Sequence, residues 1–327
     1  METSLKLKRD EIQHIESVYG LTIETSAFLG EGSGNTNFLI ETNIGDCVLS
    51  IIEEQTRDEV EIMANTLVWL ESNNFRTSRL ISPEQQENHS ITLRGKPSLL
   101  RTYMNGHVYK DLSEGMLKQL GATMAKLHEI PIPDFIGDSI FYEQKKFMDA
   151  LDANIDIEYE NWAKLRLSEL AVNHIHGLPT SVIHSDLFYD NMLFNGEQFV
   201  SMIDFELACI YHSVFDIGMA IVGTCSIDGE LSLTKAESLI TGYQSRKIIL
   251  ESEFNVLKTY TEYAAVLTSL WRYWRYKIYQ CEENNSDKYL EMMKLAKNIE
   301  GANFSTLVKP SIHKVSRDKR LDTVYDI

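Results

Sequence analysis

The chain has 327 residues, 43% of them hydrophobic, and a formal net charge of −17 at pH 7. It is long enough to bury a sizeable core and to form two lobes. The excess of acidic residues disfavours nonspecific binding to nucleic acids and anionic membranes, so we expect neither as a partner, and it is compatible with a substrate that carries an amine.

A glycine-rich segment, GEGSGNTNF, occupies residues 30–38 between two apolar runs and predicts a β-hairpin. Glycines permit unusual backbone angles and close approach, so main-chain N–H groups in such a turn can cover phosphates. The residues expected to contribute are Gly32, Ser33, Gly34, Asn35 and Thr36. Taken alone, such a cluster of glycines is more often a flexible turn, and the interpretation depends on a motif further along the chain.

Apolar periodicity predicts several further elements along the chain. Expected strands lie at 47–52, 90–93 and 97–102, and expected helices at 58–72, 113–128 and 251–280. Tyr103-Met104-Asn105-Gly106 breaks the pattern, and we place a hinge there. The hinge divides the chain into an N-terminal lobe, residues 1–102, and a C-terminal lobe, residues 103–327.

The most informative stretch is VIHSDLFYDNMLFNGEQFVSMIDFE, residues 182–206. An Asn-Gly pair between alternating apolar segments is a strong hairpin signal. The spacing places Asp186 on the turn after one strand, Asn191 five residues later, and Asp204 at the end of the hairpin. Each of these side chains alone would be an ordinary turn residue, but together they match the catalytic loop of a kinase.

Phosphoryl transfer from a nucleotide needs positioning and charge neutralisation more than covalent chemistry. Mg²⁺ prefers oxygen ligands, so Asn191 and Asp204 are expected to bind it together with the phosphates of ATP. Asp186 has the D-x-x-x-x-N spacing and is expected to accept or orient the proton of the acceptor hydroxyl. The backbone groups of Arg101 to Tyr103, at the hinge, are candidates for contacts with the adenine edge.

The third expected strand departs from the usual kinase pattern. Ser50 occupies the inward position where a kinase keeps the lysine that holds the α- and β-phosphates, although it remains a candidate nucleotide contact. The next helix carries Glu59 and Glu61 early but Asn65 in its middle, so the usual lysine–glutamate ion pair cannot form. Arg57 is a candidate for the missing charge, and a catalytically inactive kinase remnant stays open as an alternative.

Four cysteines are spread along the chain without a C-x-x-C pair, at positions 47, 209, 225 and 281. They predict buried thiols in a reducing compartment. The first residues lack the apolar core of a signal peptide, and no apolar run reaches membrane-spanning length. We therefore expect a cytoplasmic protein.

These motifs resemble the aminoglycoside phosphotransferase and choline kinase superfamily, and within it most closely the type II homoserine kinases. The segments that carry the resemblance follow the family's order over nearly the whole chain: GEGSGNTNF, VLSII, LGATMAKLHEI, HSDLFYDNMLF, MIDFELACIYHSVFDIGMAI, CSIDGELS and RYWRYKI. The resemblance implies an α+β, protein-kinase-like bilobal fold with a small antiparallel β-sheet in the N-terminal lobe and a mainly α-helical C-terminal lobe.

The resemblance also implies an activity. The catalytic motif is common to the whole superfamily, whereas the flanking segments indicate transfer of phosphate from ATP to L-homoserine in threonine synthesis. In that reaction Asp186 would be the base, and Asn191 and Asp204 would bind Mg²⁺. Relatives also carry a small hydroxyl residue where Ser50 stands. Tyr189 departs from the arginine expected in relatives, so a phosphate contact at that position is not supported.

Homoserine is a zwitterion that needs a cation for its carboxylate and an acid for its ammonium group. Arg272 is the candidate for the carboxylate, and Glu206, two residues after the metal-binding aspartate, is the candidate for the ammonium. Arginines between aromatic residues often stack or extend towards solvent instead, so these two assignments remain open.

Three alternatives remain at this point. A choline or ethanolamine kinase would use the aromatic residues of 271–276 as a cage for the ammonium group. An aminoglycoside phosphotransferase would need a more acidic acceptor cleft, and an inactive kinase fold would only bind its ligands. The sequence leaves open the choice between ATP and GTP and the oligomeric state, for which a homodimer is one arrangement.

Overall fold

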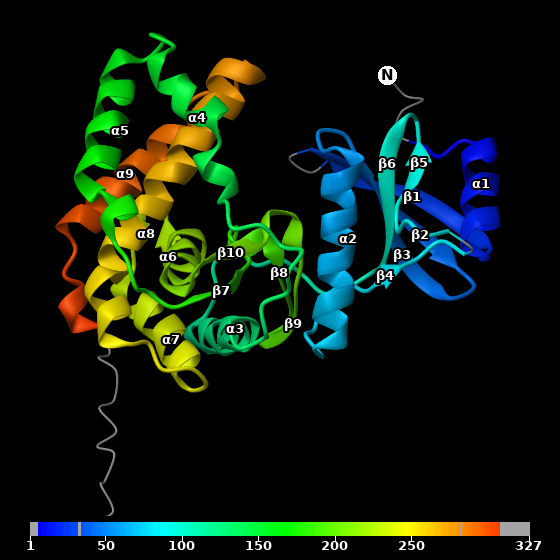
Figure 1. Cartoon of the computed structure of the whole chain (residues 1–327), viewed down its shortest axis with the longest axis horizontal. Coiled ribbons are helices and arrows are strands. Elements are labelled where there is room, and N and C mark those ends of the chain that lie inside the picture. The colour runs from blue at the N-terminus through cyan, green and yellow to red at the C-terminus, as the bar shows by residue number, and fades with distance from the viewer. Residues whose placement is uncertain (1–5, 32–33, 85, 282, 308–327) are drawn as a thin grey trace, which may run out of the picture.

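The computed structural model describes residues 6–31, 34–84, 86–281 and 283–307. Figure 1 shows two parts side by side, a sheet with flanking helices formed by the first third of the chain and a mainly helical part formed by the rest. No helix within the described ranges is long and apolar enough to cross a membrane.

The N-terminal part is built on one antiparallel sheet of six strands, in the order β1-β2-β3-β6-β4, with β5 paired to β6. The strands are β1 (Ile23–Glu31), β2 (Asn35–Thr42), β3 (Gly45–Ile52), β4 (Leu80–Ile81), β5 (Ile91–Leu93) and β6 (Lys96–Thr102). The hairpin predicted around the glycine-rich segment is the β1–β2 pair, and the other three predicted strands are β3, β5 and β6. The short strand β4 was not predicted, because two residues carry too little periodicity to detect.

Two helices cover the two faces of this sheet. Helix α1 (Arg9–Tyr19) contributes Ile15 and Tyr19 to an apolar core with the alternate residues of β2 and β3. Helix α2 (Arg57–Ser72) begins at a capping box formed by Thr56 and Glu59, and its first half packs on the opposite face. Its second half, with Leu67 and Leu70, belongs to the core of the helical part. Helix α2 therefore joins the two parts by packing, as its position between them in Figure 1 indicates.

The helical part contains the larger core. Its helices are α3 (Glu114–Leu127), α4 (Lys145–Asp149), α5 (Ile157–Leu170), α6 (Ser213–Thr224), α7 (Leu233–Gln244), α8 (Glu251–Arg272) and α9 (Lys288–Gly301). Short strands form three two-stranded pairs: β7 (Thr180–Ile183) with β10 (Cys209–His212), β8 (Met192–Asn195) with β9 (Gln198–Met202), and β11 (Ser226–Ile227) with β12 (Glu230–Leu231). The predicted Asn-Gly hairpin is the β8–β9 pair.

Glycines allow close helix contacts around the loop that follows β7. Helices α3 and α7 cross closely, since a Cβ added at Gly121 would lie 2.1 Å from the carbonyl oxygen of Leu239. Helix α6 is confined on two sides. A Cβ at Gly218 would lie 2.8 Å from the amide nitrogen of Thr261 in α8, and one at Gly223 would lie 2.3 Å from the carbonyl oxygen of Leu187.

Two predictions need correction. The long helix predicted over 251–280 is α-helical only to Arg272 and continues as a π-helix, Tyr273–Tyr279. Such wider turns reposition side chains and occur frequently at functional sites. The prediction of buried thiols is wrong for Cys281, which is exposed, whereas the other three cysteines are buried.

Candidate active site

A buried hydrogen-bond network holds the loop after β7 in place. The carboxylate of Asp216, on α6, accepts hydrogen bonds from the backbone N–H groups of His184, at 3.1 Å, and Ser185, at 2.8 Å. Ser185 has a positive φ of 72°, a conformation that needs such support. Asp216 also lies 3.0 Å from Nε2 of His128, whose Nδ1 lies 2.9 Å from the hydroxyl of Tyr243. The loop that carries Asp186 is therefore anchored to three helices.

Two side chains hold the Asp186 carboxylate by hydrogen bonds. Its Oδ1 accepts a hydrogen bond of 2.7 Å from the Tyr142 hydroxyl, and its Oδ2 one of 3.2 Å from Nδ2 of Asn191. The same Nδ2 also donates to the Asp186 carbonyl oxygen, at 2.8 Å. Burial raises the pKa of Asp186, which the hydrogen bond from Tyr142 partly offsets. Sequence reasoning missed Tyr142, which stands in a short 3₁₀ turn, Phe141–Glu143, outside every motif.

Asp204 and Asn191 offer oxygen atoms that suit a hard cation. Asp204 follows β9 in the left-handed conformation, with φ 67°, before the 3₁₀ turn Phe205–Leu207. Because Nδ2 of Asn191 is occupied by Asp186, its Oδ1 remains as an acceptor. Within the described ranges, neither this Oδ1 nor the Asp204 carboxylate accepts a hydrogen bond. One carboxylate and one amide, completed by phosphate oxygens and water, are a donor set that fits Mg²⁺.

The surrounding charge supports this fit. Burial raises the pKa of Asp190, and the negative charge of Asp204 raises it further. Burial and the same neighbour raise the pKa of Glu206 to about 8. Four acidic side chains thus line one cleft: Asp186, Asp190, Asp204 and Glu206. A bound cation would reduce the electrostatic repulsion among them.

The predicted phosphate-binding turn is only partly described. Gly32 and Ser33 lie outside the described residues. Gly34 and Asn35 line the cleft, and Nδ2 of Asn35 donates a hydrogen bond to Glu206. The Thr36 hydroxyl donates to Glu53, at 3.3 Å, and so takes part in the hairpin rather than contacting the catalytic loop.

Ser50 is buried on the sheet face that turns towards the cleft and hydrogen-bonds the side chain of Arg101. Arg57, the candidate for the missing positive charge, instead donates to the Thr92 hydroxyl at the exposed start of α2. At the hinge, the amide of Thr102 donates to the carbonyl of Arg79, and that of Tyr103 to the carbonyl of Asp46, at 2.9 Å. These two N–H groups are therefore already engaged in the protein.

The two acids early in α2 are also accounted for. Glu59 caps its own helix, and Glu61 accepts hydrogen bonds from the backbone of His89 and Ser90. Neither pairs with Ser50 or Arg101, as expected from the absence of the usual lysine.

A cavity of about 840 Å³ opens in front of Asp186 and Asp204. The glycine-rich hairpin, the catalytic loop, residues 139–146 and the π-helix segment line it. Arg272 lies in its wall, 17% exposed, with Nη1 3.0 Å from Glu291 and its guanidinium 5.8 Å from the ring centre of Phe188. Within the described ranges, no hydrogen bond or ion pair joins Arg272 to Glu206. The acid that Arg272 does influence is Asp190, whose pKa its positive charge lowers.

An ion pair spans the cavity between the two parts of the molecule. Nη1 of Arg275, in the π-helix, lies 2.5 Å from Oε1 of Glu54, just after β3. The Arg275 side chain is only 7% exposed, and it also lies over the ring of Tyr279. The partners are 221 positions apart in sequence, so no local pattern predicted this contact.

The aromatic segment does not form a four-residue cage. Trp271, Trp274 and Tyr276 line the cavity, but Tyr273 is buried on the other side, where its hydroxyl donates to Glu160 at 2.5 Å. Lys146 lies over the Trp274 ring, at 4.8 Å, and brings a positive charge to this wall.

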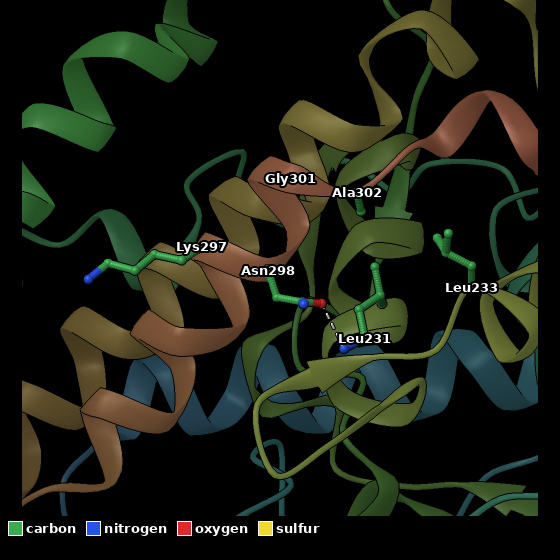
Figure 2. A pocket seen from close by; sticks show the side chains of 6 residues that line it. All are labelled: Leu231, Leu233, Lys297, Asn298, Gly301 and Ala302. Carbon is green, nitrogen blue, oxygen red and sulfur yellow. Dashed lines mark hydrogen bonds between the residues drawn. The ribbon is translucent and has the colours of Figure 1, made fainter.

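A second hollow, of about 380 Å³, lies on the far side of the helical part and is shown in Figure 2. Asn298 belongs to its lining, and its Oδ1 accepts a hydrogen bond of 3.0 Å from the backbone N–H of Leu231. The only ionisable side chain drawn there is that of Lys297, which points away from the hollow. Its lining therefore gives no sign of catalytic chemistry.

The chain is similar in sequence to several known proteins. Residues 25–248 match the model of a family described as "Phosphotransferase enzyme family". A homoserine kinase of Caulobacter sp. (strain K31) is 27% identical over 253 residues, which cover 73% of this chain and 77% of that protein. A homoserine kinase of Agrobacterium fabrum (strain C58 / ATCC 33970) is 24% identical over 264 residues, covering 77% and 80%.

Solved structures show a similar fold at low sequence identity. The amicoumacin kinase hAmiN, in complex with AMP-PNP, Ca²⁺ and Ami, has a TM-score of 0.73 and 13% identity, covering 94% of this chain and 99% of that chain. Spectinomycin phosphotransferase APH(9)-Ia, in complex with ADP and spectinomycin, has a TM-score of 0.63 and 14% identity, covering 89% and 94%. The predicted α+β, kinase-like bilobal fold is confirmed.

Proposed function

This chain belongs to the phosphotransferase enzyme family, and on that premise we propose that it transfers the γ-phosphate of ATP to the hydroxyl group of L-homoserine. The observation that carries the proposal is that Tyr142 and Asn191 hold Asp186 in the lining of a cavity that Asp204 also lines. Relatives named homoserine kinase, matched over more than three quarters of their length, support the choice of acceptor.

In the proposed reaction the acceptor hydroxyl donates its hydrogen bond to Asp186. The oxygen of that hydroxyl attacks the γ-phosphorus, the bond between this phosphorus and the β,γ-bridging oxygen breaks, and the hydroxyl proton passes to Asp186. Asn191 keeps the base in position through its Nδ2, and its Oδ1, together with Asp204, would hold the metal. Bound Mg²⁺ would supply positive charge to the phosphate oxygens.

The two lobes have separate tasks in this proposal, with residues 1–102 holding the nucleotide and residues 103–327 holding the catalytic loop and the acceptor. Residues 32–36 would cover the phosphates. Since the amides of Thr102 and Tyr103 are engaged, the adenine edge would use the free backbone groups of the hinge.

The proposed acceptor wall is the side of the cavity that carries Arg272 and Lys146. Its charge fits an amino acid better than a quaternary ammonium compound. Arg272 and Lys146 bring two positive charges to the cavity and favour a carboxylate there. For the ammonium group, the sequence favours Glu206, but in the structure this side chain is turned to Asn35. Asp190 lies in the same cavity within the electrostatic influence of Arg272 and is better placed for it.

The proposal is tested by measuring ADP release with a panel of acceptors, namely homoserine, ethanolamine, choline, methylthioribose and aminoglycosides. We expect kcat/KM for homoserine to exceed that of every other acceptor by at least about 100-fold, the factor that about 3 kcal/mol of selective binding provides. The variant Asp186→Asn serves as the control and should bind MgADP but release none from ATP. A better acceptor than homoserine would contradict the substrate, and nucleotide binding without turnover on any acceptor would favour the inactive remnant.

A further inference from the structure

Three polar side chains from adjacent strands form a hydrogen-bonded row on the sheet face that turns towards the cleft. Nη2 of Arg101, on β6, donates to the Ser50 hydroxyl at 2.8 Å. The Ser50 hydroxyl, on β3, donates to Oδ1 of Asn37, on β2, at 2.6 Å. Ser50 is only 1% exposed, so the row fixes where the arginine side chain ends. The guanidinium of Arg101 therefore lies at the end of the Ser50 side chain.

Arg101 differs from the other arginines around the cleft in its partners. Arg272 forms an ion pair with Glu291, and Arg275 forms one with Glu54. A guanidinium has five N–H donors, and within the described ranges Arg101 uses one of them, on a neutral hydroxyl, without a carboxylate at ion-pair distance. The remaining donors of this half-buried cation are open to solvent or to a ligand, and phosphate oxygens are acceptors that match them.

The surroundings of Arg101 indicate which ligand that is. Its positive charge acts on Glu206, which also feels the negative charge of Asp204 and accepts a hydrogen bond from Asn35. Asn35 begins β2 directly after the glycine-rich turn. Arg101 is thus within electrostatic reach of Glu206, which is hydrogen-bonded to the start of β2 after the glycine-rich turn and stands two residues after the proposed metal ligand Asp204.

We propose that the guanidinium of Arg101 binds the α- and β-phosphates of the nucleotide, in the role for which the chain has no lysine at position 50, and that Ser50 and Asn37 hold it there. This inference rests on the proposed phosphotransfer function but not on the identity of the acceptor. The planar fork of an arginine can donate two parallel hydrogen bonds to phosphate oxygens and keeps its charge at every physiological pH. The missing lysine is then no sign of an inactive protein.

The test compares ligands with and without phosphates. Isothermal titration calorimetry measures the affinities of MgADP and adenosine for the full-length protein, for Arg101→Met and for the control Arg57→Met, which removes an exposed arginine of the same lobe. For Arg101→Met we expect MgADP to bind about 10- to 100-fold more weakly, the usual consequence of losing charge-assisted hydrogen bonds, while adenosine binding changes less than about twofold. Arg57→Met should leave both affinities unchanged.

The variant Arg101→Lys keeps the charge but loses the fork, and it should bind MgADP with an affinity between those of the wild type and Arg101→Met. It also provides a folded variant if Arg101→Met fails to fold. Unchanged MgADP affinity in either Arg101 variant would overturn the proposal, as would an equal loss for adenosine and MgADP. Since no acceptor is present, a failed substrate prediction leaves this result unaffected.

Discussion

Substituting Gly223 by alanine should reduce catalysis far more than stability. The added Cβ would lie 2.3 Å from the carbonyl oxygen of Leu187 and 2.7 Å from Cα of Phe188, the two residues after Asp186. Ordinary contact begins at about 3.4 Å, so the backbone must separate by about 1 Å. Helix α6 cannot retreat, because Gly218 already rests against the backbone of α8. The catalytic loop must therefore move.

The magnitudes follow from two opposing effects on stability and one on rate. Alanine favours a helix over glycine by about 1 kcal/mol, whereas overpacking costs about 1–3 kcal/mol, so the net loss should be about 1 kcal/mol. A displacement of about 1 Å at a catalytic group can cost about 100-fold in rate. We expect kcat for ADP release to fall by that factor with MgADP affinity little changed.

The matched control is Gly115→Ala, also in a helix, where the added Cβ would meet its nearest neighbour, a carboxylate oxygen of Glu197, at 3.5 Å. It should leave kcat unchanged and stability equal or slightly higher. Urea denaturation and steady-state kinetics on the same samples separate the two effects. If folded Gly223→Ala kept kcat within about threefold of wild type, the assumption that the loop rather than the helix yields would be refuted.

Three further predictions concern single contacts. Tyr142→Phe removes the phenol that donates to Asp186 and should lower kcat about 10-fold with little change in KM for ATP; unchanged kcat would show that the hydrogen bond does not position the base. Arg272→Ala should raise KM for homoserine while leaving KM for ATP nearly constant, and an unaltered homoserine KM in initial-rate assays would place the arginine outside the acceptor site. Arg166→Met leaves the nearly buried carboxylate of Glu262 without its partner and should lower the free energy of unfolding at pH 7 by about 3 kcal/mol. Burial already raises the pKa of Glu262 above its unfolded value, so the stability contributed by this group is present at low pH and is lost as pH rises. The difference in unfolding free energy between wild type and Arg166→Met, measured by urea titration, should therefore shrink from pH 7 towards pH 4.5. A difference that stayed constant with pH would contradict the argument.

The β8–β9 hairpin, which carries the candidate site, was predicted correctly because its residues are close in sequence. Asp186, Asn191 and the β8–β9 hairpin occupy one stretch of the chain, and the first two, five positions apart, lie in hydrogen-bond contact. The same holds for most strands of the sheet and for α3, which begins directly after Ser113, close to the predicted start. Local periodicity and turn chemistry were sufficient there.

The parts that were missed depend on contacts between distant segments. Tyr142 reaches Asp186 across 44 positions of sequence, and Arg101 reaches Ser50 across 51. The role of Arg101 was sought in its backbone at the hinge, because strand alternation shows which face a side chain takes but not how far a long one extends. The start of the π-helix after Arg272 and the exposure of Cys281 are likewise set by packing that no short pattern records.

The bridge between Glu54 and Arg275 has a thermodynamic consequence for the order of binding events. Glu54 follows β3 near the proposed nucleotide turn, and Arg275 lies near the proposed acceptor site, so a ligand that strengthens the bridge from either side would favour binding on the other side. Linkage then requires the effect to be mutual: the factor by which nucleotide tightens acceptor binding must equal the factor by which acceptor tightens nucleotide binding. We expect Glu54→Gln to reduce this shared factor, and the size of the reduction would measure what the bridge contributes to cooperativity between the two proposed substrates.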